Sequence, residues 1–368
     1  MSVAATLTEA RLKRILARFK SRRVLVVGDI YLDRYVHLDK RLSEVSLETG
    51  LEAHQVVRIE NAPGHGGTVI NNLRALGVPT WALCVIGADG HGQDLTQALK
   101  DRGVRIEAVL QSAARFTPAY IKLILHANGK AREITRLDVK NRKPMGPAWE
   151  ARVIQTLRKL VPRMDAVIVA DQTEERNCGV ITTRVRMELQ RLSRAHPKKF
   201  FLVDSRMRIG EYRDVLVKPN EKEARRAAGA TEKMGAKAGQ GTSLDSARHQ
   251  IARKMAARVG RPVFMTLGED GMLLAEPKAS RNGRDLEVGL QNGVRHMPAI
   301  KVKGPLDICG AGDSTTAGIV AALASGASLP EAAAVGQLVA SITIQQLGTT
   351  GTATATQVLK RFRETARR

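Results

Sequence analysis

Apolar runs alternate with amphipathic segments along most of the chain. The apolar runs are short and continuous, several end in Gly or Asp, and such runs are typical of buried parallel strands. They lie at residues 23–29, 81–87, 166–171, 200–204, 215–218 and 263–268. Helical periodicity occupies the intervening residues 69–76, 94–102, 149–160, 182–195 and 245–259. This alternation predicts an α/β fold with a doubly wound, mostly parallel sheet, and a ligand site beyond the carboxyl ends of the strands.

Two stretches break the alternation. Residues 35–59 and 116–137 show a period-two pattern of polar and apolar positions. This pattern predicts antiparallel strands outside the main sheet, forming a small β lid over the ligand site. Polar, Gly-containing segments at residues 229–242 and 281–293 predict loops. Residues 1–368 contain no internal repeat and are interpreted as a single domain.

Composition is that of a folded globular protein with a large positive charge. Hydrophobic residues make up 43% of the chain, charged residues 26%, and the net charge is +23. Such a charge attracts anionic substrates and polyanions, so nucleic-acid binding is the rival hypothesis. The sequence has no zinc-finger spacing or aromatic-rich RNA-binding pattern, and its basic clusters at residues 11–23 and 184–199 lie on expected amphipathic helices. We therefore expect nonspecific attraction but no specific nucleic-acid partner.

The cysteines and the N-terminal residues give information about the cellular location of the protein. Three widely spaced cysteines form no disulfide or metal-binding pattern, which favours a reducing, cytoplasmic environment. No apolar run approaches the roughly 18 residues of a membrane span, so we expect no membrane association. Residues 1–23 are Arg-rich like a transit peptide, but their apolar stripe leads directly into a strand. A docked first helix is therefore the preferred interpretation.

The turn before the small-residue helix at residues 315–325 carries the most distinctive chemistry. It reads Asp-Ile-Cys-Gly-Ala-Gly-Asp-Ser at residues 307–314. Its glycines allow a tight turn, and free amides at a helix N-terminus attract anions. An Asp in the same turn can accept a proton from an attacking hydroxyl, and phosphoryl transfer needs both elements. By itself the motif also fits an ordinary Gly-rich loop with an N-capping Asp, so the rest of the sequence must distinguish between the two interpretations.

The pattern D-x-x-G-A-G-D followed by a small-residue helix resembles the C-terminal motif of the ribokinase (phosphofructokinase-B) family of carbohydrate kinases. Further segments resemble the family in order, at residues 26–35, 218–223, 266–271 and 347–349. The likeness extends over the whole chain and implies an ATP-dependent carbohydrate kinase with Mg²⁺ as cofactor. G-D-x-x-L-D-R-Y at residues 28–35 and R-L-D at 136–138 resemble the heptose 7-phosphate kinases most. Since the sequence ends at Arg368, we expect no attached nucleotidyltransferase activity.

The resemblance implies roles for residues on the nucleotide side. Asp313 would be the general base, and the amides of Gly310, Ala311 and Gly312 would form the anion hole. Asn220 and Glu223 would act through water on Mg²⁺ and the ATP phosphates, although the same pair fits a helix capping box. The remaining candidates for ATP and Mg²⁺ binding are Thr266, Gly268, Gly271 and Asp307.

The acceptor side departs from the family pattern. The candidates for substrate binding are Asp33, Gly66, Gly67, Thr68, Asn71 and Asp171. Thr68 stands where the family has a sugar-contacting Asn, and Asn71, one turn later, is the candidate substitute. The segment after Asp171 lacks the Tyr-Gly-Lys-Gly type sequence of heptose kinases, and Cys309 stands where Thr is common. Lys122 and Arg136 on the expected lid are either ligands for an acceptor phosphate or solvated charges.

We therefore expect transfer of the γ-phosphoryl group of ATP to a hydroxyl of a sugar or sugar phosphate, with heptose 7-phosphate as one candidate. A kinase of the same fold for a nucleoside or another sugar remains the first alternative. A non-catalytic nucleotide-binding protein is the second. The resemblance also implies a homodimer formed through the lid.

Overall fold

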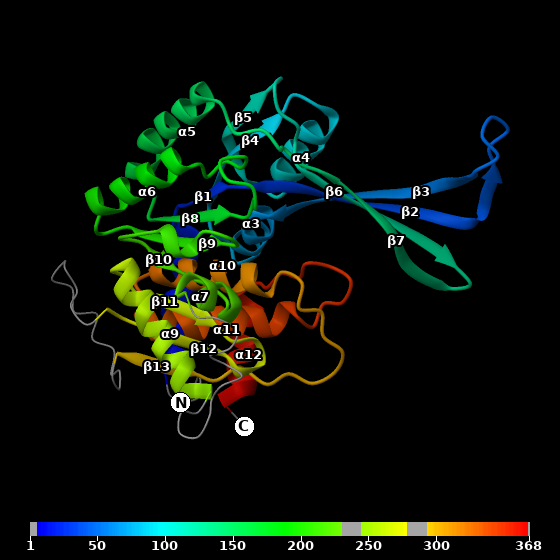
Figure 1. The fold of residues 1–368 in the computed structure, drawn as a ribbon. Coiled ribbons are helices and arrows are strands. Elements are labelled where there is room, and N and C mark those ends of the chain that lie inside the picture. Colours follow the sequence, from blue (N-terminus) through cyan, green and yellow to red (C-terminus); the bar gives the residue numbers. More distant parts are fainter. Residues whose placement is uncertain (1–5, 230–243, 278–292, 367–368) are drawn as a thin grey trace.

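The computed structural model describes residues 6–229, 244–277 and 293–366 (Figure 1). The loops expected at residues 229–242 and 281–293 lie almost entirely outside this part of the chain. The core is a nine-stranded sheet with the order β13-β12-β11-β10-β9-β8-β1-β4-β5. In that order the strands are β13 (Val294–Met297), β12 (Met272–Ala275), β11 (Val263–Thr266), β10 (Leu216–Val217), β9 (Phe200–Ser205), β8 (Ala166–Asp171), β1 (Val24–Gly28), β4 (Thr80–Gly87) and β5 (Arg105–Ser112).

Seven of these strands, from β11 to β5, run parallel, and β12 and β13 add an antiparallel edge. The doubly wound, mostly parallel sheet predicted from the sequence is thus confirmed. The α-helices are α2 (Glu9–Ala17), α3 (Gly66–Ala75), α4 (Gly90–Asp101), α5 (Pro147–Leu160), α6 (Thr183–Ala195), α7 (Glu221–Ala227), α9 (Leu244–Val259), α10 (Ala311–Ala324), α11 (Leu329–Thr343) and α12 (Ala355–Ala366). Short 3₁₀ turns are η1 (Phe19–Ser21), η2 (Val161–Arg163), η3 (Ile209–Glu211) and η4 (Gly268–Asp270).

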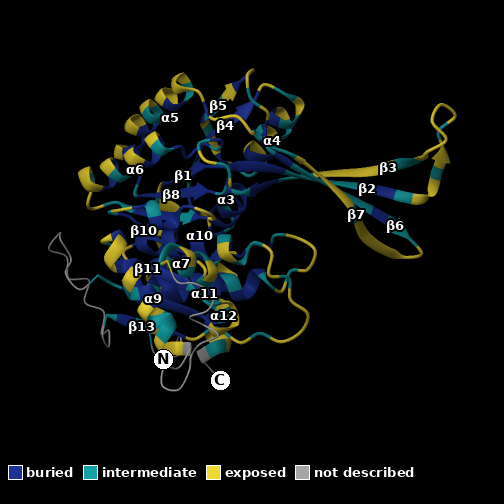
Figure 2. Ribbon diagram, in the orientation of Figure 1, coloured by how far each residue is buried: buried dark blue, intermediate teal, exposed yellow. Residues whose placement is uncertain are grey.

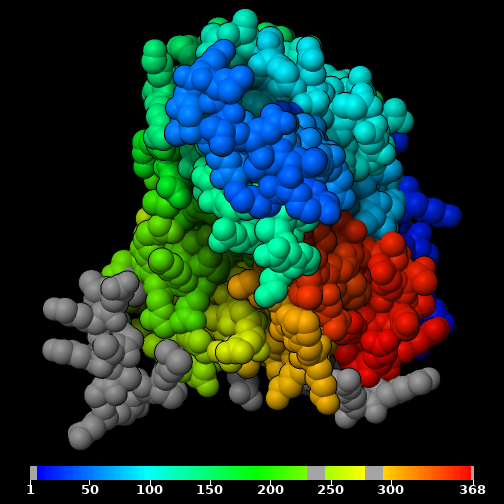
Figure 3. All heavy atoms as spheres, turned by 90° about the vertical axis from the view of Figure 1, so that its right-hand side faces the viewer, coloured from blue at the N-terminus to red at the C-terminus, as the bar shows by residue number. Residues whose placement is uncertain are grey.

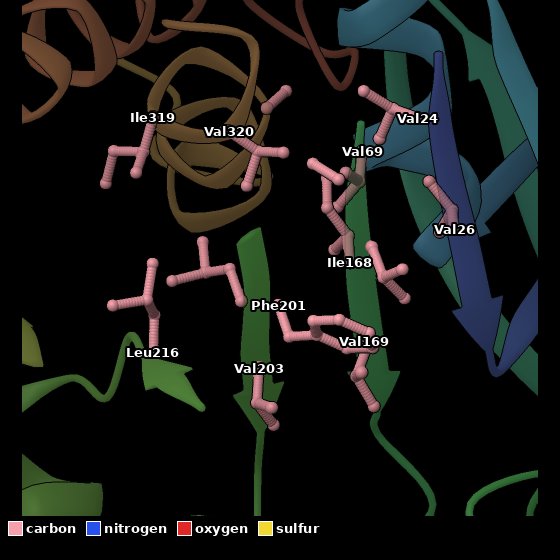
Figure 4. Packing of buried hydrophobic residues seen from close by; sticks show 14 of the residues in the cluster. Val24, Val26, Val69, Ile168, Val169, Phe201, Val203, Leu216, Ile319 and Val320 are labelled. Atoms are coloured by element: carbon pink, nitrogen blue, oxygen red, sulfur yellow. The ribbon is translucent and has the colours of Figure 1, made fainter. Parts of the chain in front are cut away.

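The core lies between the sheet and its helices. The central strands are buried along their length, while the outer sides of the helices are exposed (Figure 2). Figure 4 shows branched side chains of β1, β8 and β9 packed with Ile319 and Val320 of α10. The N-terminal helix α2 buries Leu12 and Ile15, as expected for a docked first helix. No helix in the described part of the chain has the length and apolarity needed to cross a bilayer.

The junction between β1 and the lid requires a glycine. Gly28 has φ +139°, and a Cβ there would lie 2.1 Å from the carbonyl oxygen of Ala170 on β8. A side chain would therefore separate the two strands where both reach the carboxyl edge of the sheet. The chain then turns through Asp29 into β2 (Ile30–Val45).

The lid is a four-stranded sheet that projects from the body (Figure 1). Its strands are β2, β3 (Glu52–His65), β6 (Ala119–Ala127) and β7 (Lys130–Val139), in the order β3-β2-β6-β7. The expected lid is present. The first hairpin spans residues 30–65 and so extends beyond the expected 35–59 at both ends, whereas the second spans 119–139 and begins and ends slightly later than the expected 116–137. Both hairpins are antiparallel, whereas β2 and β6 pair in parallel. The expectation of purely antiparallel strands is therefore wrong at this junction, because pairing between distant segments leaves no mark in local periodicity.

Candidate active site

The site is built where two helix N-termini meet at the carboxyl edge of the sheet. Gly310 has φ +77° and turns the chain into α10, placing Asp313 in the first turn of that helix. A Cβ at Gly310 would lie 3.1 Å from Cγ2 of Thr68, which is near the start of α3. The glycine therefore allows the two helix starts to approach closely. Positive helix-end dipoles from both sides then favour negative charge in the space between them.

Asp313 has an environment that weakens its acidity. Burial in the site, followed by the negative charge of Asp204, raises the pKa of Asp313 to about 7, while Lys218 opposes the rise. A carboxyl group with such a pKa is present in both protonation states near neutral pH. That property suits a general base working at physiological pH.

Lys218 and Asp204 form an ion pair beside Asp313. The Lys218 Nζ lies 2.9 Å from Oδ2 of Asp204, and both side chains are largely buried. Burial alone would lower the pKa of Lys218, but the charge of Asp204 and its hydrogen bond raise it. A Cβ at Gly312 would lie 3.5 Å from the Lys218 Nζ, so the ammonium group is next to the glycine turn. Sequence reasoning assigned neither residue a role, although both stand at the ends of apolar runs.

The glycine turn offers two free amides. The amide of Ala311 donates to the carbonyl oxygen of Ile308 at 3.1 Å, so this member of the expected anion hole is engaged within the turn. For the amides of Gly310 and Gly312, no backbone acceptor is found among the described residues. Asp307 fixes the turn, since its carboxylate accepts hydrogen bonds from the amides of Cys309 and Gly348, at 2.9 and 3.0 Å.

Asn220 and Glu223 form the capping box that was the alternative interpretation. Asn220 Oδ1 accepts from the Glu223 amide at 2.8 Å, and Glu223 Oε2 accepts from the Asn220 amide at 2.9 Å. The other carboxylate oxygen of Glu223 has no hydrogen bond within the described residues. Burial, and then the charge of Asp204, raises the pKa of Glu223. Glu223 can therefore cap the helix and bind a ligand at the same time, because only one of its two carboxylate oxygens takes part in the capping box.

Thr266, Gly268 and Gly271 lie together at the end of β11. The Thr266 amide donates to the carbonyl oxygen of Pro219 at 2.9 Å, which joins this end of the strand to the Asn220 turn. A Cβ at Gly271 would lie 2.2 Å from the carbonyl oxygen of Met297, whereas a Cβ at Gly268 would meet open space. Gly271 therefore serves packing, and Gly268 borders an open surface.

The opposite wall of the site comes from the base of the lid. Asp33 of β2 lies against Gly64 of β3, where a Cβ would be 2.4 Å from Asp33 Oδ2. Burial raises the pKa of Asp33, against the opposing charges of Lys122 and Arg136. The Arg136 guanidinium lies 4.8 Å from the ring centroid of Tyr120, and the Lys140 ammonium 5.6 Å from it. Two cations, Arg136 and Lys140, therefore lie against the Tyr120 ring at the base of the lid.

His65 is the residue that sequence reasoning overlooked on this wall. Its ring centroid lies 4.3 Å from that of Tyr31 and 5.4 Å from that of Tyr120. As the N-cap of α3 it has φ +53° and ψ −115°, which costs a non-glycine residue about 1–3 kcal/mol. Burial, and then the charges of Arg206 and Lys140, lowers the pKa of His65 to about 4, so the imidazole is neutral. Within the described residues its ring nitrogens have no hydrogen bond.

The expected substrate residues at the start of α3 are mostly buried. The Gly66 amide donates to the carbonyl oxygen of Asp29 at 3.0 Å, and a Cβ at Gly67 would lie 2.4 Å from Cβ of Pro63. Thr68 is only 2% exposed. The Asn71 amide group donates to the Pro63 carbonyl at 3.2 Å. Thr68 and Asn71 thus lie in the tightly packed turn between β3 and α3, where Cγ2 of Thr68 faces the glycine turn at Gly310.

Asp171 lies inside a buried network at the end of β8. Its carboxylate accepts hydrogen bonds from Ser205 at 2.7 Å, Arg208 at 2.9 Å and Tyr212 at 3.1 Å, and the residue is 1% exposed. Both oxygens are therefore occupied by protein groups. Asp171 therefore has partners within the protein that hold it in place at the end of β8.

Comparisons with known proteins agree with this geometry. The family model described as pfkB family carbohydrate kinase matches residues 21–356. A protein named bifunctional protein HldE from Desulfatibacillum aliphaticivorans is 29% identical over 332 residues, covering 90% of this chain and 61% of that protein. The protein of the same name from Paramagnetospirillum magneticum is 28% identical, covering 89% of this chain and 60% of its own length. The chain thus spans about three fifths of these relatives.

Two solved structures share the fold. Arabidopsis thaliana ribokinase complexed with ribose and ATP has a TM-score of 0.63 at 20% identity, covering 92% of this chain and 98% of its own. Phosphofructokinase-2 from Escherichia coli, in complex with substrates and products, also has a TM-score of 0.63, at 18% identity, covering 94% and 99%. At such identities the likeness concerns the fold alone.

Proposed function

Since the chain belongs to the pfkB family of carbohydrate kinases, we propose that it transfers the γ-phosphoryl group of ATP to a hydroxyl of a phosphorylated sugar. The observation that carries this proposal is the environment of Asp313. A carboxyl group with a pKa of about 7 stands in the first turn of α10, beside two free amides and the buried Lys218 ammonium. A base and a positively polarised anion site are thereby placed within one turn of each other.

The reaction follows from these groups. Asp313 accepts the proton of the acceptor hydroxyl as its oxygen bonds to the γ-phosphorus and the bond to ADP breaks. The amides of Gly310 and Gly312, together with Lys218, stabilise the charge on the phosphoryl oxygens as it moves. The lid above the site limits the access of water, so the sugar hydroxyl and not water is phosphorylated.

Mg²⁺ fits the residues as an ion held chiefly by phosphates and water. The described residues contain no cluster of three or more His, Cys, Asp or Glu side chains able to hold a metal. Glu223 offers one free carboxylate oxygen, and Mg²⁺ usually keeps several waters and binds through one or two carboxylates and substrate phosphates. When bound, the ion would neutralise phosphate charge. Glu223 would hold it through water.

Cations at the base of the lid and after core strand β9 support an anionic acceptor. Arg136, Lys140 and Arg206 all influence His65 and Tyr120 electrostatically, while Asp33 supplies a carboxylate for sugar hydroxyls. A phosphate on the acceptor would lie near these cations, with its hydroxyl directed to Asp313. Because relatives of this chain are named HldE, heptose 7-phosphate is the first candidate to test.

The lid also offers a surface for a second copy of the chain. Apolar side chains are exposed along its longer hairpin, at Leu42, Val45, Leu47, Leu51, Val56, Val57 and Ile59. Figure 3 looks onto this part of the lid, in blue, beside the second hairpin in green-cyan. Pairing of two lids would remove this surface from water. Light scattering should then find a dimer, and Ile59→Lys should shift it to monomer; a monomeric wild type would contradict the proposal.

The decisive experiment is an acceptor panel with ADP release as readout. It includes heptose 7-phosphate, other sugar phosphates, their unphosphorylated sugars and nucleosides. We expect turnover with a phosphorylated sugar, abolished by Asp313→Asn with little change in ATP affinity. Preference for an unphosphorylated sugar or a nucleoside would refute the assignment of an anionic acceptor. Near-normal activity of the Asp313→Asn variant would refute the assignment of the base.

A further inference from the structure

The edge of the sheet opposite the active site collects basic residues from distant parts of the sequence. Strands β9, β8 and β1 are adjacent and parallel, so the turns that precede them lie side by side. Backbone contacts join these turns, since the Asp165 amide donates to the Arg23 carbonyl at 2.8 Å. The Lys199 ammonium donates to the Pro162 carbonyl at 2.9 Å. The two basic clusters noted in the sequence, at residues 11–23 and 184–199, therefore meet here.

A groove of about 510 Å³ lies between these turns. Its polar lining consists of Arg22, Asp165, His196, Lys198 and Lys199. Asp165 is the carboxylate of this lining, and it already accepts a hydrogen bond from the Arg23 amide at 2.8 Å and lies 3.7 Å from the Arg22 guanidinium. The groove is thus left with an excess of positive charge.

The cations of these turns differ from those on the neighbouring helix. On α6, Arg184, Arg191 and Arg194 are paired with carboxylates at 2.7–3.0 Å. By contrast, five cations at the starts of the three strands have no carboxylate within ion-pair distance in the described part of the chain. They are Lys20, Arg23, Lys159, Arg163 and Lys198, all exposed.

We propose that the basic surface of the turns before β1, β8 and β9, which comprises this groove and the five unpaired cations of these turns, binds the phosphodiester backbone of a nucleic acid without reading its sequence. A polymer of phosphates can meet several of these cations at once, and the released counterions supply the free energy of binding. The aromatic side chains that line the groove, His196 and Phe200, are only partly exposed, and no groove-lining residue is an exposed large apolar residue that could enter a membrane. The place of the groove at the far edge of the sheet separates it from the kinase site.

Fluorescence anisotropy of a labelled 20-nucleotide single-stranded DNA tests the proposal on the full chain. The groove variant combines Lys20→Glu, Arg163→Glu and Lys198→Glu, one from each turn. The control variant combines Lys130→Glu, Lys254→Glu and Lys360→Glu, three exposed lysines elsewhere. Both variants have the same net charge, so their difference isolates position. Thermal unfolding of each variant checks that it is folded.

We expect the groove variant to bind at least tenfold more weakly at 100 mM salt, and the control less than threefold. Since each lost phosphate contact on a single strand lowers the slope of log K against log salt by about 0.7, the slope should fall by about 2. Equal losses in both variants would show that net charge alone binds DNA and would overturn the proposal. Undetectable binding by the wild type would do the same. Binding to vesicles of anionic phospholipid, abolished by the groove variant, without binding to DNA would assign the groove to a membrane surface instead.

Discussion

Beside the larger effect of burial, the charges of Asp204 and Lys218 shift the pKa of Asp313 in opposite directions, so replacing one or the other should move the pH dependence of catalysis in opposite directions. Lys218→Met removes the positive charge that opposes the high pKa of Asp313 and leaves Asp204 without its ion-pair partner. Both effects make ionisation of Asp313 harder, so its pKa should rise. Asp204→Asn removes the negative charge that raises this pKa, so the pKa should fall.

The expected loss of activity in Lys218→Met follows from the pKa of Asp313 in the wild type. With a pKa of about 7, about half of Asp313 is ionised at pH 7. Loss of a neighbouring cation typically moves a carboxyl pKa by about 1–3 units. A rise of one to two units leaves about 9% to 1% ionised, which lowers kcat/KM at pH 7 by about 5- to 50-fold. The loss should largely disappear by about pH 9.5, where the base is ionised again.

The assay is the pH profile of kcat/KM for the acceptor between pH 5.5 and 9.5, at saturating ATP. Lys222→Met is the matched control, since Lys222 is an exposed lysine four positions away and should leave the profile unchanged. We expect the acid limb to move upward in Lys218→Met and downward in Asp204→Asn. A pH-independent loss in Lys218→Met, with an unmoved acid limb, would refute the reasoning and show that Lys218 acts on the phosphoryl group alone.

Three further predictions concern stability. Because the folded-state pKa of Asp313 lies above its unfolded value of 3.8, the carboxyl group destabilises the fold increasingly between those pH values and fully above pH 7. Asp313→Asn should therefore gain about 1–3 kcal/mol in urea unfolding at pH 8 and nothing at pH 3.5; equal gains would contradict this. His65→Gly should be about 1–2 kcal/mol more stable than His65→Ala, the reverse of the usual order, because only glycine relieves the positive φ. If alanine is the more stable in urea unfolding, His65 is not strained. Asp171→Ala should lose about 3–5 kcal/mol, since it leaves the buried Arg208 unpaired, while the acceptor KM of the folded fraction stays unchanged. A raised KM would restore Asp171 as a substrate ligand.

The sequence predicted the elements whose signal is local. Apolar runs located most of the parallel core, and the turn at Gly310 located helix α10, to which we assign the proposed base. The strands β5, β12 and β13 were not predicted. In β5 (Arg105–Ser112) buried and exposed positions are mixed without a continuous apolar run, and β12 and β13 are only four residues long. A short strand at the edge of a sheet carries too few residues for a clear periodicity.

The active site was predictable where a motif carried it and unpredictable where tertiary contacts made it. The ion pair of Lys218 and Asp204 joins the ends of two neighbouring strands, and no spacing along the chain indicates that contact. The positive φ of His65 was also not predictable, because it too depends on tertiary contacts. The adjacent Gly66 and Gly67 did indicate a crowded turn. Asp171 stands at the carboxyl end of its strand, where site residues are expected, yet its carboxylate oxygens accept hydrogen bonds from Arg208 and Tyr212.

Strand β2 runs without interruption from the edge of the core sheet to the tip of the lid, and β3 returns along it from the tip to His65. The residues that would face the proposed acceptor and the residues that a second subunit would contact are therefore neighbours on the same strands. Evolution could replace this hairpin as a unit, exchanging acceptor preference and assembly together while conserving the transfer chemistry of α10. A chimera that receives residues 30–65 and 119–139 from a relative with a known acceptor should inherit both properties in one step.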